Sequence, residues 1–514
     1  MATREQAYQE CLTHTNNALA TQVLIDKYFM CVDNDYKETN LKQMWSRLAK
    51  TIVRAEIRDK DIYEKRFYNS LENFKFVPGG RILYGLGLEG MNVTLKNCYV
   101  IAIKEDSIKG VFQTAYEMAE TLKHGGGCGI NISPLRPRGS IVHNAAKCSS
   151  GAVSFMNFFS HITGMIGQNA RIGALIICLD VDHPDIEDFI LIKGSDLELV
   201  RFANISILMT DKFMMAVEKN KNFDLQFNNI VYKTIKAREL WKKIIHYAWK
   251  RAEPGLLFWD NIIKESIPDN YERFNTVATN PCAESPLSHG DSCNLGSINL
   301  GKYVVDSFEK SAKFDFNAMD QDIRCGIRFL DDIITLEKCP FEFQQWANDN
   351  GRRLGLGVMG LADVFLRMRI KYNTDQALLL AEEIIKKFRD TSYDESCELA
   401  KEKGPFPVFN VKRHFKSPFI QRLPLLIQKK IKKYGIRNIS LHAIAPTGSL
   451  QCIAQCSGSI EPVYEMQYYR STNLGTAKET KKHLIIHSVA QEYMDKYSCK
   501  FEDLPDLIFL WVSL

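Results

Sequence analysis

The sequence contains no run of about 18 apolar residues, which is the length that a membrane-spanning helix needs. Near its start there is also no basic stretch followed by an apolar segment, so the pattern of a secretory signal peptide is missing. These two absences predict a chain without a membrane span that works in the cytoplasm.

Cysteine spacings that are typical of zinc sites or redox motifs are missing too. None of the 14 cysteines forms a Cys-x-x-Cys pair, and Cys452 and Cys456 have no histidine close to them in the sequence. In a chain of this size without a secretory signal, we expect reduced thiols rather than a disulfide framework. We therefore predict no metal site, and we interpret Cys452 and Cys456 as helix-packing residues.

The sequence has little net charge and no linker-like composition. The formal net charge is +5 over 514 residues, and 45% of the residues are hydrophobic, which is typical of a globular protein. No Ser/Gly-rich stretch and no repeat of roughly 20–50 residues is present. The lysines at 429–433 lack the aromatic partners of a nucleic-acid site, so we interpret them as a solvated helix face and expect no nucleic-acid partner.

Helical periodicity dominates residues 1–75, and an α/β pattern follows over residues 76–514. Two N-terminal stretches place apolar residues at the spacing of one buried helix face. Their members are Leu41, Met44, Trp45, Leu48 and Ile52, then Ile62, Tyr63, Phe67, Leu71 and Phe74. Further on, apolar runs such as 98–103 and 175–181 predict buried strands, and the polar stretch 219–232 predicts a surface excursion.

The segment Asn280-Pro281-Cys282-Ala283-Glu284 carries the most chemical information. Pro281 disfavours a helix, and in an extended chain Asn280, Cys282 and Glu284 would share one face. That face would offer an amide, an oxidisable sulfur and a carboxylate base. Taken by itself, the pattern also fits a loop with a buried cysteine and a solvated glutamate.

Two further segments are rich in backbone donors or glycine. Gly125–Gly129 contains three consecutive glycines, which permit either close approach of a ligand or a tight turn. Pro446-Thr447-Gly448-Ser449 precedes a predicted helix and fits either a phosphate cradle or an ordinary helix cap.

Together these segments resemble the catalytic subunit of ribonucleotide reductases, in one order from residue 77 to the end of the chain. The motifs that carry the resemblance are Val77–Arg81, Asn97-Cys98, the triple glycine, Ser154–Met156, His183–Glu187, Pro254-Gly255, Asn280–Glu284, Cys293–Ile298, Arg352–Gly357, Met359–Asp363, Pro446–Ser449 and Ile460–Pro462. The resemblance implies a ten-stranded α/β barrel of the ribonucleotide reductase and glycyl-radical type, behind the N-terminal helical region.

The implied activity is reduction of ribonucleotides to 2'-deoxyribonucleotides by a thiyl-radical mechanism. Cys282 resembles the radical residue that takes a hydrogen atom from the substrate ribose. Glu284 resembles the base on the 3'-hydroxyl, and Asn280 resembles the amide that orients the sugar. Cys98 and Cys293 resemble the pair that donates two electrons and closes to a disulfide.

Substrate, cofactor and reductant also follow from the resemblance. Asn97 and the phosphate-binding Thr447, Gly448 and Ser449 would hold the ribonucleotide. The motifs at 77–81 and 280–284 are more similar to the adenosylcobalamin-dependent branch, class II, than to class I, whose metal-containing radical partner stays the alternative. A thioredoxin-type protein or another dithiol would reduce the disulfide again.

The family is regulated by ATP and deoxynucleoside triphosphates, which bind with Mg²⁺. Asp106 resembles an effector-binding carboxylate, and Gly167–Ala174, with Arg171, resembles a specificity loop, as does Lys193–Phe202. From the residues alone, Asp106 and Arg171 could equally be surface charges. The implied assembly is a homodimer.

Two departures from the family pattern shape the expectations. The N-terminal region is too short for an additional ATP-binding cone. The chain also ends at Leu514, where the family continues. We therefore expect a barrel without its last strands, which a second chain or segment would supply. Alternatively, the chain is half of a split reductase or a non-catalytic nucleotide-binding fragment.

Overall fold

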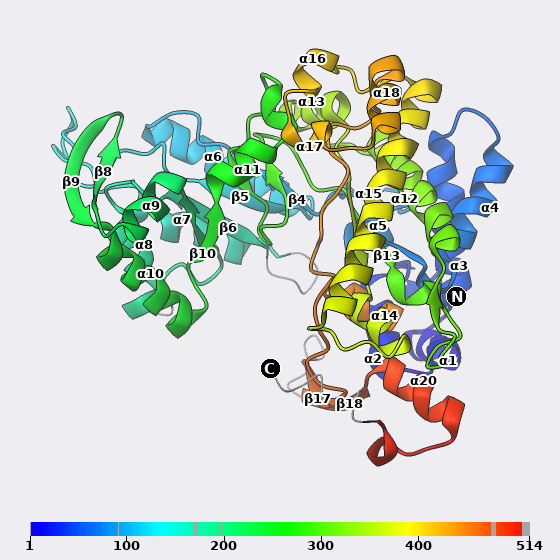
Figure 1. Ribbon diagram of the computed structural model, residues 1–514. Helices are drawn as coiled ribbons and strands as arrows, with labels where there is room; N and C mark the ends of the chain where they lie inside the picture. Colours follow the sequence, from blue (N-terminus) through cyan, green and yellow to red (C-terminus); the bar gives the residue numbers. More distant parts are fainter. Residues whose placement is uncertain (1, 91, 168–172, 196–197, 474–479, 506–514) are drawn as a thin grey trace.

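The computed structural model describes every residue except 1, 91, 168–172, 196–197, 474–479 and 506–514. Figure 1 shows two lobes, one built from the N-terminal helices together with long central helices and the other from residues coloured cyan to green. Among the described residues, no helix combines the length and the apolar character that crossing a membrane requires.

Helices dominate the N-terminal region, as the periodicity predicted. They are α1 (Arg4–Thr15), α2 (Ala18–Lys27), α3 (Leu41–Ile52) and α4 (Lys60–Leu71), with β1 (Cys31–Val32) and β2 (Asp35–Tyr36) between α2 and α3. All five predicted residues of the α3 face are buried, and the Asn40 side chain caps the helix by accepting from the Gln43 amide. The α4 face differs from the prediction: Phe67 and Leu71 are buried, but Ile62 is 58% exposed.

A parallel five-stranded sheet forms the core of the second lobe, in the order β10-β7-β6-β5-β4. Its strands are β4 (Cys98–Val100), β5 (Gly127–Asn131), β6 (Leu175–Asp180), β7 (Asn204–Met209) and β10 (Gly255–Phe258). Its helices are α6 (Ile108–Lys123), α7 (Met156–Met165), α8 (Ile186–Ser195), α9 (Asp211–Glu218), α10 (Ala237–Arg251) and α11 (Trp259–Glu265). Leu175 and Ile177 of β6 pack with the helices, whereas Ile176 and Cys178 join a cluster on the opposite face. Both faces are therefore buried, which explains the uninterrupted apolar run.

The surface excursion predicted at 219–232 is found at residues 222–236. They fold into an antiparallel hairpin of β8 (Asn222–Phe227) and β9 (Ile230–Lys236) at one edge of the molecule (Figure 1). Most of β9 is exposed.

A smaller sheet, β16-β13-β3, lies in the other lobe. It contains β3 (Phe76–Pro78), β13 (Leu295–Asn299) and β16 (Gly355–Met359), with α5 (Gly80–Gly85), α12 (Phe316–Leu336), α13 (Glu342–Gly351), α14 (Leu361–Arg367) and α15 (Asp375–Lys403) nearby in the chain. β13 pairs with β16 in parallel and with β3 in antiparallel orientation. An extended segment at 440–444 runs beside β16, where the Leu356 amide donates to the Leu441 carbonyl over 2.9 Å.

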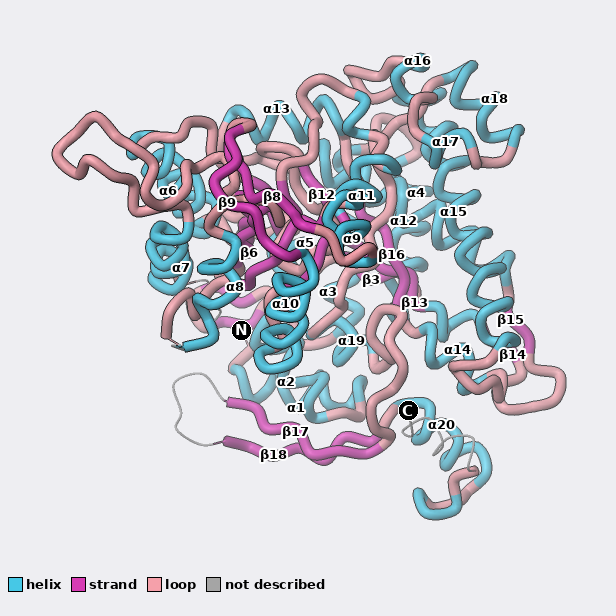
Figure 2. Tube along the Cα trace, turned by 60° about the vertical axis from the view of Figure 1, so that its left-hand side comes forward, coloured by secondary structure: helices cyan, strands magenta, loops and turns pink. Residues whose placement is uncertain are grey.

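The remaining elements are short. They are β11 (Ala278–Thr279), β12 (Pro286–Leu287), β14 (Val304–Val305), β15 (Lys313–Phe314), α16 (Val411–His414), α17 (Pro418–Gln421), α18 (Leu425–Tyr434), α19 (Ser449–Ala454), β17 (Gln467–Asn473), β18 (Thr480–Ile486) and α20 (Ser488–Tyr497). Figure 2 shows the β17–β18 hairpin and α20 together at one end of the molecule.

Residues 290–293 join the two sheets, because this segment runs antiparallel to β4 and continues into β13. The Gly290 amide donates to the Val100 carbonyl over 2.8 Å, and the Cys293 amide donates to the Cys98 carbonyl over 2.9 Å. The described residues thus form a mixed α/β architecture behind an N-terminal helical region. Closure into a ten-stranded barrel stays a prediction.

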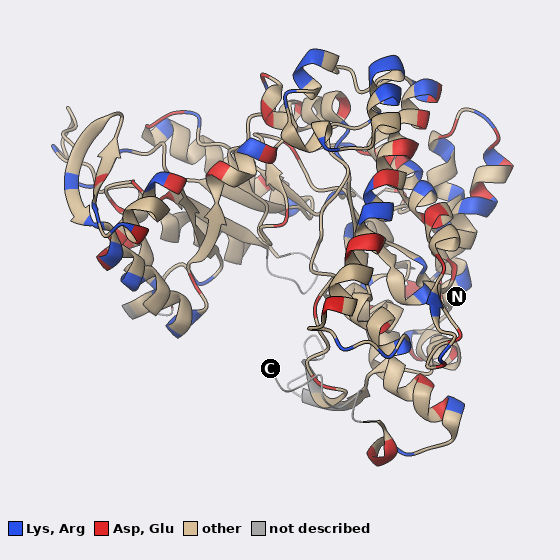
Figure 3. Ribbon diagram, in the orientation of Figure 1, with Lys and Arg blue, Asp and Glu red and all other residues tan. Residues whose placement is uncertain are grey.

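A buried ion-pair network fixes the lobe that carries the smaller sheet. Figure 3 shows acidic and basic residues interspersed along the outer helices, but Asp331 of α12 is fully buried. Its carboxylate accepts from Arg352 over 3.0 Å, Arg437 over 3.2 Å and Asn438 over 2.9 Å. Burial alone would raise the pKa of Asp331, but the two guanidinium groups outweigh it and lower that pKa.

We predict that Asp331→Ala lowers the free energy of unfolding by about 3–5 kcal/mol, because it leaves buried guanidinium groups without their carboxylate. Urea unfolding measures the change. The lowered pKa means that the stabilisation is present above the ordinary aspartate pKa, near 4, and is lost as the pH falls below it.

Asp26→Ala is the matched control, since Asp26 pairs with Arg4 at 2.8 Å on the surface. Exposed pairs contribute about 0–1 kcal/mol. A loss of similar size in both variants would show that the buried network has no special role.

Candidate functional site

The loop between β11 and β12 carries the amide, thiol and carboxylate that the sequence singled out. It is a tight turn rather than the predicted extended segment. The Ala283 amide donates to the Asn280 carbonyl over 2.8 Å, the Ser285 amide donates to Asn280 Oδ1 over 2.9 Å, and Ala283 has a φ of 68°. The turn, not a shared strand face, therefore brings Asn280, Cys282 and Glu284 together.

The triple-glycine segment seats this loop. A Cβ atom at Gly129 would lie 1.8 Å from the Thr279 carbonyl oxygen, and one at Gly127 would lie 3.2 Å from the Pro281 ring. The side chain of Asn204 at the start of β7 donates to the Pro281 carbonyl over 3.4 Å. The glycines thus let the chain around Pro281 lie directly against β5. The sequence had left two roles open for these glycines, close approach of a ligand or a tight turn, and in the structure they permit close approach of another segment of the chain.

Cys98 and Cys293 lie opposite each other at the junction of the two sheets. The Cys293 amide donates to the Cys98 carbonyl over 2.9 Å, and the Asn97 amide donates to the Cys293 carbonyl over 3.2 Å. Both side chains are buried, with 8% and 1% exposure. Asp291, two residues before Cys293, is held by Arg353 Nε over 2.7 Å.

The three thiols differ in exposure but share an environment that keeps them protonated. Burial, together with the neighbouring Cys293, Cys282 and Glu284, holds the pKa of Cys98 well above its usual range. Burial and Glu284 act in the same way on the pKa of Cys293. Cys282 is an exposed residue, yet partial burial of its thiol, followed by the charge of the nearby Glu284, raises its pKa to about 11. At neutral pH all three sulfurs therefore carry a hydrogen atom.

Buried polar atoms without partners surround these thiols. Asn97 Oδ1, Asn280 Nδ2 and Glu284 Oε2 are buried and have no hydrogen-bond partner within the described structure. Burial also raises the pKa of Glu284, although the Asn280 side chain lowers it in part. Unsatisfied buried groups are rare in native proteins, so this set indicates a ligand that both donates and accepts hydrogen bonds.

Comparison with known families gives two adjoining matches. The ribonucleotide reductase all-alpha domain matches residues 15–90, and the ribonucleotide reductase barrel domain matches residues 96–503. The chain belongs to the ribonucleotide reductase family.

Curated relatives are similar over most of this reductase-family chain. It is 38% identical to a vitamin B12-dependent ribonucleoside-diphosphate reductase of Thermoplasma acidophilum over 413 residues, which are 79% of this chain and 50% of the relative. A protein of the same description from Mycobacterium tuberculosis H37Rv is 33% identical over 88% of this chain and 61% of the relative. The ribonucleoside-diphosphate reductase subunit alpha of Chlamydia pneumoniae is 25% identical over 89% and 48%. The chain thus spans about half to three fifths of the length of these relatives.

The predicted phosphate loop of this reductase-family chain leads into α19. Gly448 has a φ of 48°, and Thr447 Oγ1 accepts from the Ser459 amide over 3.1 Å. The Ser449 hydroxyl lies 2.5 Å from that of Tyr28 in the N-terminal region. Ala443 and Ala445, in the segment before the loop, belong to the same buried cluster as Cys98 and Cys293.

The predicted effector residue Asp106 lines a cavity of about 350 Å³ at the start of α6. Its carboxylate accepts from Arg136 Nε over 2.7 Å and from the Arg136 amide over 3.2 Å. Sequence reasoning missed Arg136, because no local motif marks a residue 30 positions away. The other effector prediction, Arg171, lies outside the described residues.

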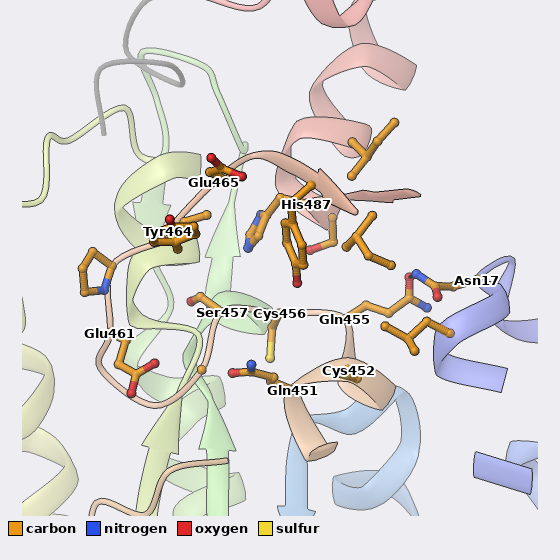
Figure 4. A pocket seen from close by; sticks show the side chains of 18 residues that line it. Asn17, Gln451, Cys452, Gln455, Cys456, Ser457, Glu461, Tyr464, Glu465 and His487 are labelled. Atoms are coloured by element: carbon orange, nitrogen blue, oxygen red, sulfur yellow. Dashed lines mark hydrogen bonds between the residues drawn. The ribbon is translucent and has the colours of Figure 1, made fainter. Parts of the chain in front are cut away.

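The prediction that Cys452 and Cys456 pack within a helix is wrong for Cys456: Cys452 belongs to α19, but that helix ends at Ala454. Both line a second cavity of about 350 Å³, together with His487, which is distant in the sequence (Figure 4). In the part of the chain that the structure describes, no group of three or more His, Cys, Asp or Glu side chains is arranged to hold a metal ion. All 14 cysteines are free thiols.

We predict that an alkylating reagent modifies Cys282 in the folded protein but spares Cys98 and Cys293, because Cys282 is the exposed one of these three thiols. Since its pKa is about 11, the labelling rate should rise about tenfold per pH unit up to that value. Glu284→Gln removes a nearby negative charge, so it should lower the pKa of Cys282 and speed its labelling at mildly alkaline pH.

Peptide-resolved mass spectrometry measures these rates. Cys31, an exposed thiol of the β1–β2 hairpin, is the internal reference and should not respond to Glu284→Gln. Labelling of Cys293 as fast as Cys282 in native protein would contradict the described geometry.

Proposed function

We propose that this chain carries the catalytic site of a ribonucleotide reductase, which converts ribonucleotides to 2'-deoxyribonucleotides by thiyl-radical chemistry. One observation carries the proposal: an exposed thiol, two buried thiols and three unpartnered polar atoms meet at the junction of the two sheets. The hydroxyl groups of a ribose ring donate and accept hydrogen bonds, so they would provide the partners that these polar atoms lack.

Each side chain of the turn has a role in the first step. Cys282, as a thiyl radical, takes the hydrogen atom from C3' of the ribose and later returns it. Glu284 accepts the proton of the 3'-hydroxyl, for which its raised pKa makes it a stronger base than an ordinary glutamate. Asn280 donates its free amide hydrogens to the sugar hydroxyls.

The buried thiols supply the reducing equivalents. The C2'–O bond breaks and the 2'-hydroxyl leaves as water, while Cys98 and Cys293 give up two protons and two electrons and form a disulfide. Both thiols are neutral because burial raises their pKa, so each still has its proton to give. A thioredoxin-type protein or a small dithiol then reduces the disulfide.

Substrate binding extends from the thiols to the start of α19. Asn97 Oδ1 lies unpartnered beside the site, and the backbone of Thr447, Gly448 and Ser449 leads into a helix start, where free N–H groups favour anions. We assign the ribose to the region of Asn97 and the thiols, and the phosphates to the loop at 447–449.

Adenosylcobalamin fits the exposed position of Cys282, because a bulky cofactor can reach that sulfur but not the buried Cys98 or Cys293. The relatives from Thermoplasma acidophilum and Mycobacterium tuberculosis are described as vitamin B12-dependent. When bound, the cofactor would supply the oxidising equivalent that removes the hydrogen atom from the Cys282 thiol. Ala283, which follows Cys282 in the turn and is partly exposed, would form part of its contact surface.

We predict that Cys282→Ser abolishes deoxyribonucleotide formation while leaving folding and nucleotide binding intact. Serine has nearly the size of cysteine, but its O–H bond is too strong for hydrogen-atom transfer at this site. Because the chain spans only part of its relatives, the assay supplies the remaining portion as a second chain or a fusion, together with adenosylcobalamin and a dithiol. In that assembly we also propose closure of the ten-stranded barrel.

Cys98→Ser and Cys293→Ser are the matched controls. They should stop dithiol-driven turnover but leave radical formation at Cys282 detectable by electron paramagnetic resonance. Turnover by Cys282→Ser at the rate of the unsubstituted enzyme would refute the mechanism.

The cavity beside Asp106 is the proposed site for a nucleoside triphosphate effector with Mg²⁺. Arg136 offers a guanidinium group for the phosphates, and Asp106 holds that group from the other side. Ile108, Phe112 and Tyr116 form an exposed stripe along α6, with 63%, 57% and 55% exposure. Ile108 also lines the cavity, so we propose that a second copy of the chain covers the stripe and completes the site in a homodimer.

We predict that Arg136→Ala weakens the binding of deoxynucleoside triphosphates at least tenfold, because a charged hydrogen-bond donor to phosphate contributes about 1.5–3 kcal/mol. Arg138→Ala is the control, since the Arg138 side chain is exposed and its nearest carboxylate, that of Asp188, is as far away as 3.9 Å. Calorimetry measures both affinities. Equal affinity of the Arg136→Ala variant and the unsubstituted chain would place the effector elsewhere.

A further inference from the structure

The N-terminal helical region holds α19 at both of its ends. At the start, the Tyr28 hydroxyl lies 2.5 Å from the Ser449 hydroxyl. At the end, Gln455 Nε2 donates to the Thr15 carbonyl over 2.9 Å, and Asn17 Nδ2 lies 3.5 Å from Gln455 Oε1. Figure 4 shows Gln455 extending from α19 toward Asn17 at the start of α2. Residues more than 400 positions apart thus fix the helix that follows the phosphate loop.

Tyr28 is itself fixed and cannot swing away from Ser449. It is the C-cap residue of α2, with only 2% of its surface exposed. Its carbonyl accepts from Arg47 over 3.2 Å, and the same guanidinium group donates to the Leu83 carbonyl over 3.1 Å. A buried ion pair with Glu38 over 2.7 Å holds Arg47 in place.

The consecutive glycines at 79 and 80 leave room for this arrangement. A Cβ atom at Gly80 would lie 3.3 Å from the Tyr28 hydroxyl, and one at Gly79 would lie 2.8 Å from Asn97 Oδ1. The two glycines therefore stand between the phosphate loop and the thiol site, with Tyr28 on one side and Asn97 on the other.

The hydrogen bond between the two hydroxyls has a favoured direction. A phenolic hydroxyl is the stronger acid, so Tyr28 donates and Ser449 accepts. The hydrogen of Ser449 is then free to be donated to a phosphate oxygen, and the bond that it accepts strengthens it as a donor.

We propose that Tyr28 is a positioning residue for the diphosphate of the substrate, acting through the Ser449 hydroxyl, so that the N-terminal helical region sets substrate affinity. This inference rests on the proposed function, in which the 447–449 loop binds phosphate. Tyr28 does not touch the substrate. It fixes the hydroxyl that does.

Binding of cytidine diphosphate and of inorganic pyrophosphate to the 514-residue chain tests the inference by calorimetry. Tyr28→Phe removes only the hydroxyl and should weaken binding of both probes about five- to tenfold, the effect of one lost hydrogen bond. Ser449→Ala should weaken binding at least as much, and Tyr28→Phe should have no further effect in the Ser449→Ala background.

Tyr271→Phe is the matched control, because the Tyr271 hydroxyl is also buried and lies 3.1 Å from His414 Nδ1. It should resemble Tyr28→Phe in thermal stability while binding both probes normally. Deoxynucleoside triphosphate binding at the Asp106 cavity should be unchanged in all variants.

The outcomes separate the two proposals. If Ser449→Ala weakens binding and Tyr28→Phe does not, the positioning role is overturned and the phosphate loop stands. If the two effects add, Tyr28 acts by another route and the inference fails as well. If Ser449→Ala binds both probes normally, the phosphate assignment fails, and the role of Tyr28 fails with it.

Discussion

The short antiparallel pairing of β4 with residues 290–293 is the constraint on which the rest of the structure depends. Four backbone hydrogen bonds of 2.8–3.2 Å join the parallel sheet to the segment that becomes β13. The same pairing places Cys98 opposite Cys293. The same hydrogen bonds therefore join the two sheets and bring the two thiols together. A change in this pairing would alter both the contact between the sheets and the position of the thiols.

Burial at this junction sets the chemistry of the site. It excludes water from two thiols and leaves polar atoms of Asn97, Asn280 and Glu284 without partners. Such groups cost free energy in the absence of a ligand. The cost is tolerated because ion pairs hold the surrounding chain, with Arg353 on Asp291 beside Cys293 and Asp331 at the centre of a second network.

The regions around the junction are linked to it by short stretches of chain. Asp106 follows Cys98 by eight residues and lies where the next helix, α6, begins. On the other side, the strand-like segment at 440–443 runs along β16 and continues into the loop that Tyr28 reaches. A ligand at the phosphate loop would therefore lie at the end of a segment whose Ala443 and Ala445 belong to the same buried cluster as the thiols.

The sequence by itself determined the helical N-terminal region and the buried strands, and it singled out the five residues that we propose carry the chemistry. Periodicity and ordered motifs are patterns along the chain, so they can be recognised in the sequence without a structure. Only the tertiary structure decided that residues 280–285 turn rather than extend, that the glycines seat this turn, that Arg136 contacts Asp106 and that Tyr28 contacts Ser449. These facts depend on contacts between residues far apart in the chain: Tyr28 and Ser449 are separated by 421 positions. No local pattern records such a contact, because each residue has an ordinary structural role in its own segment.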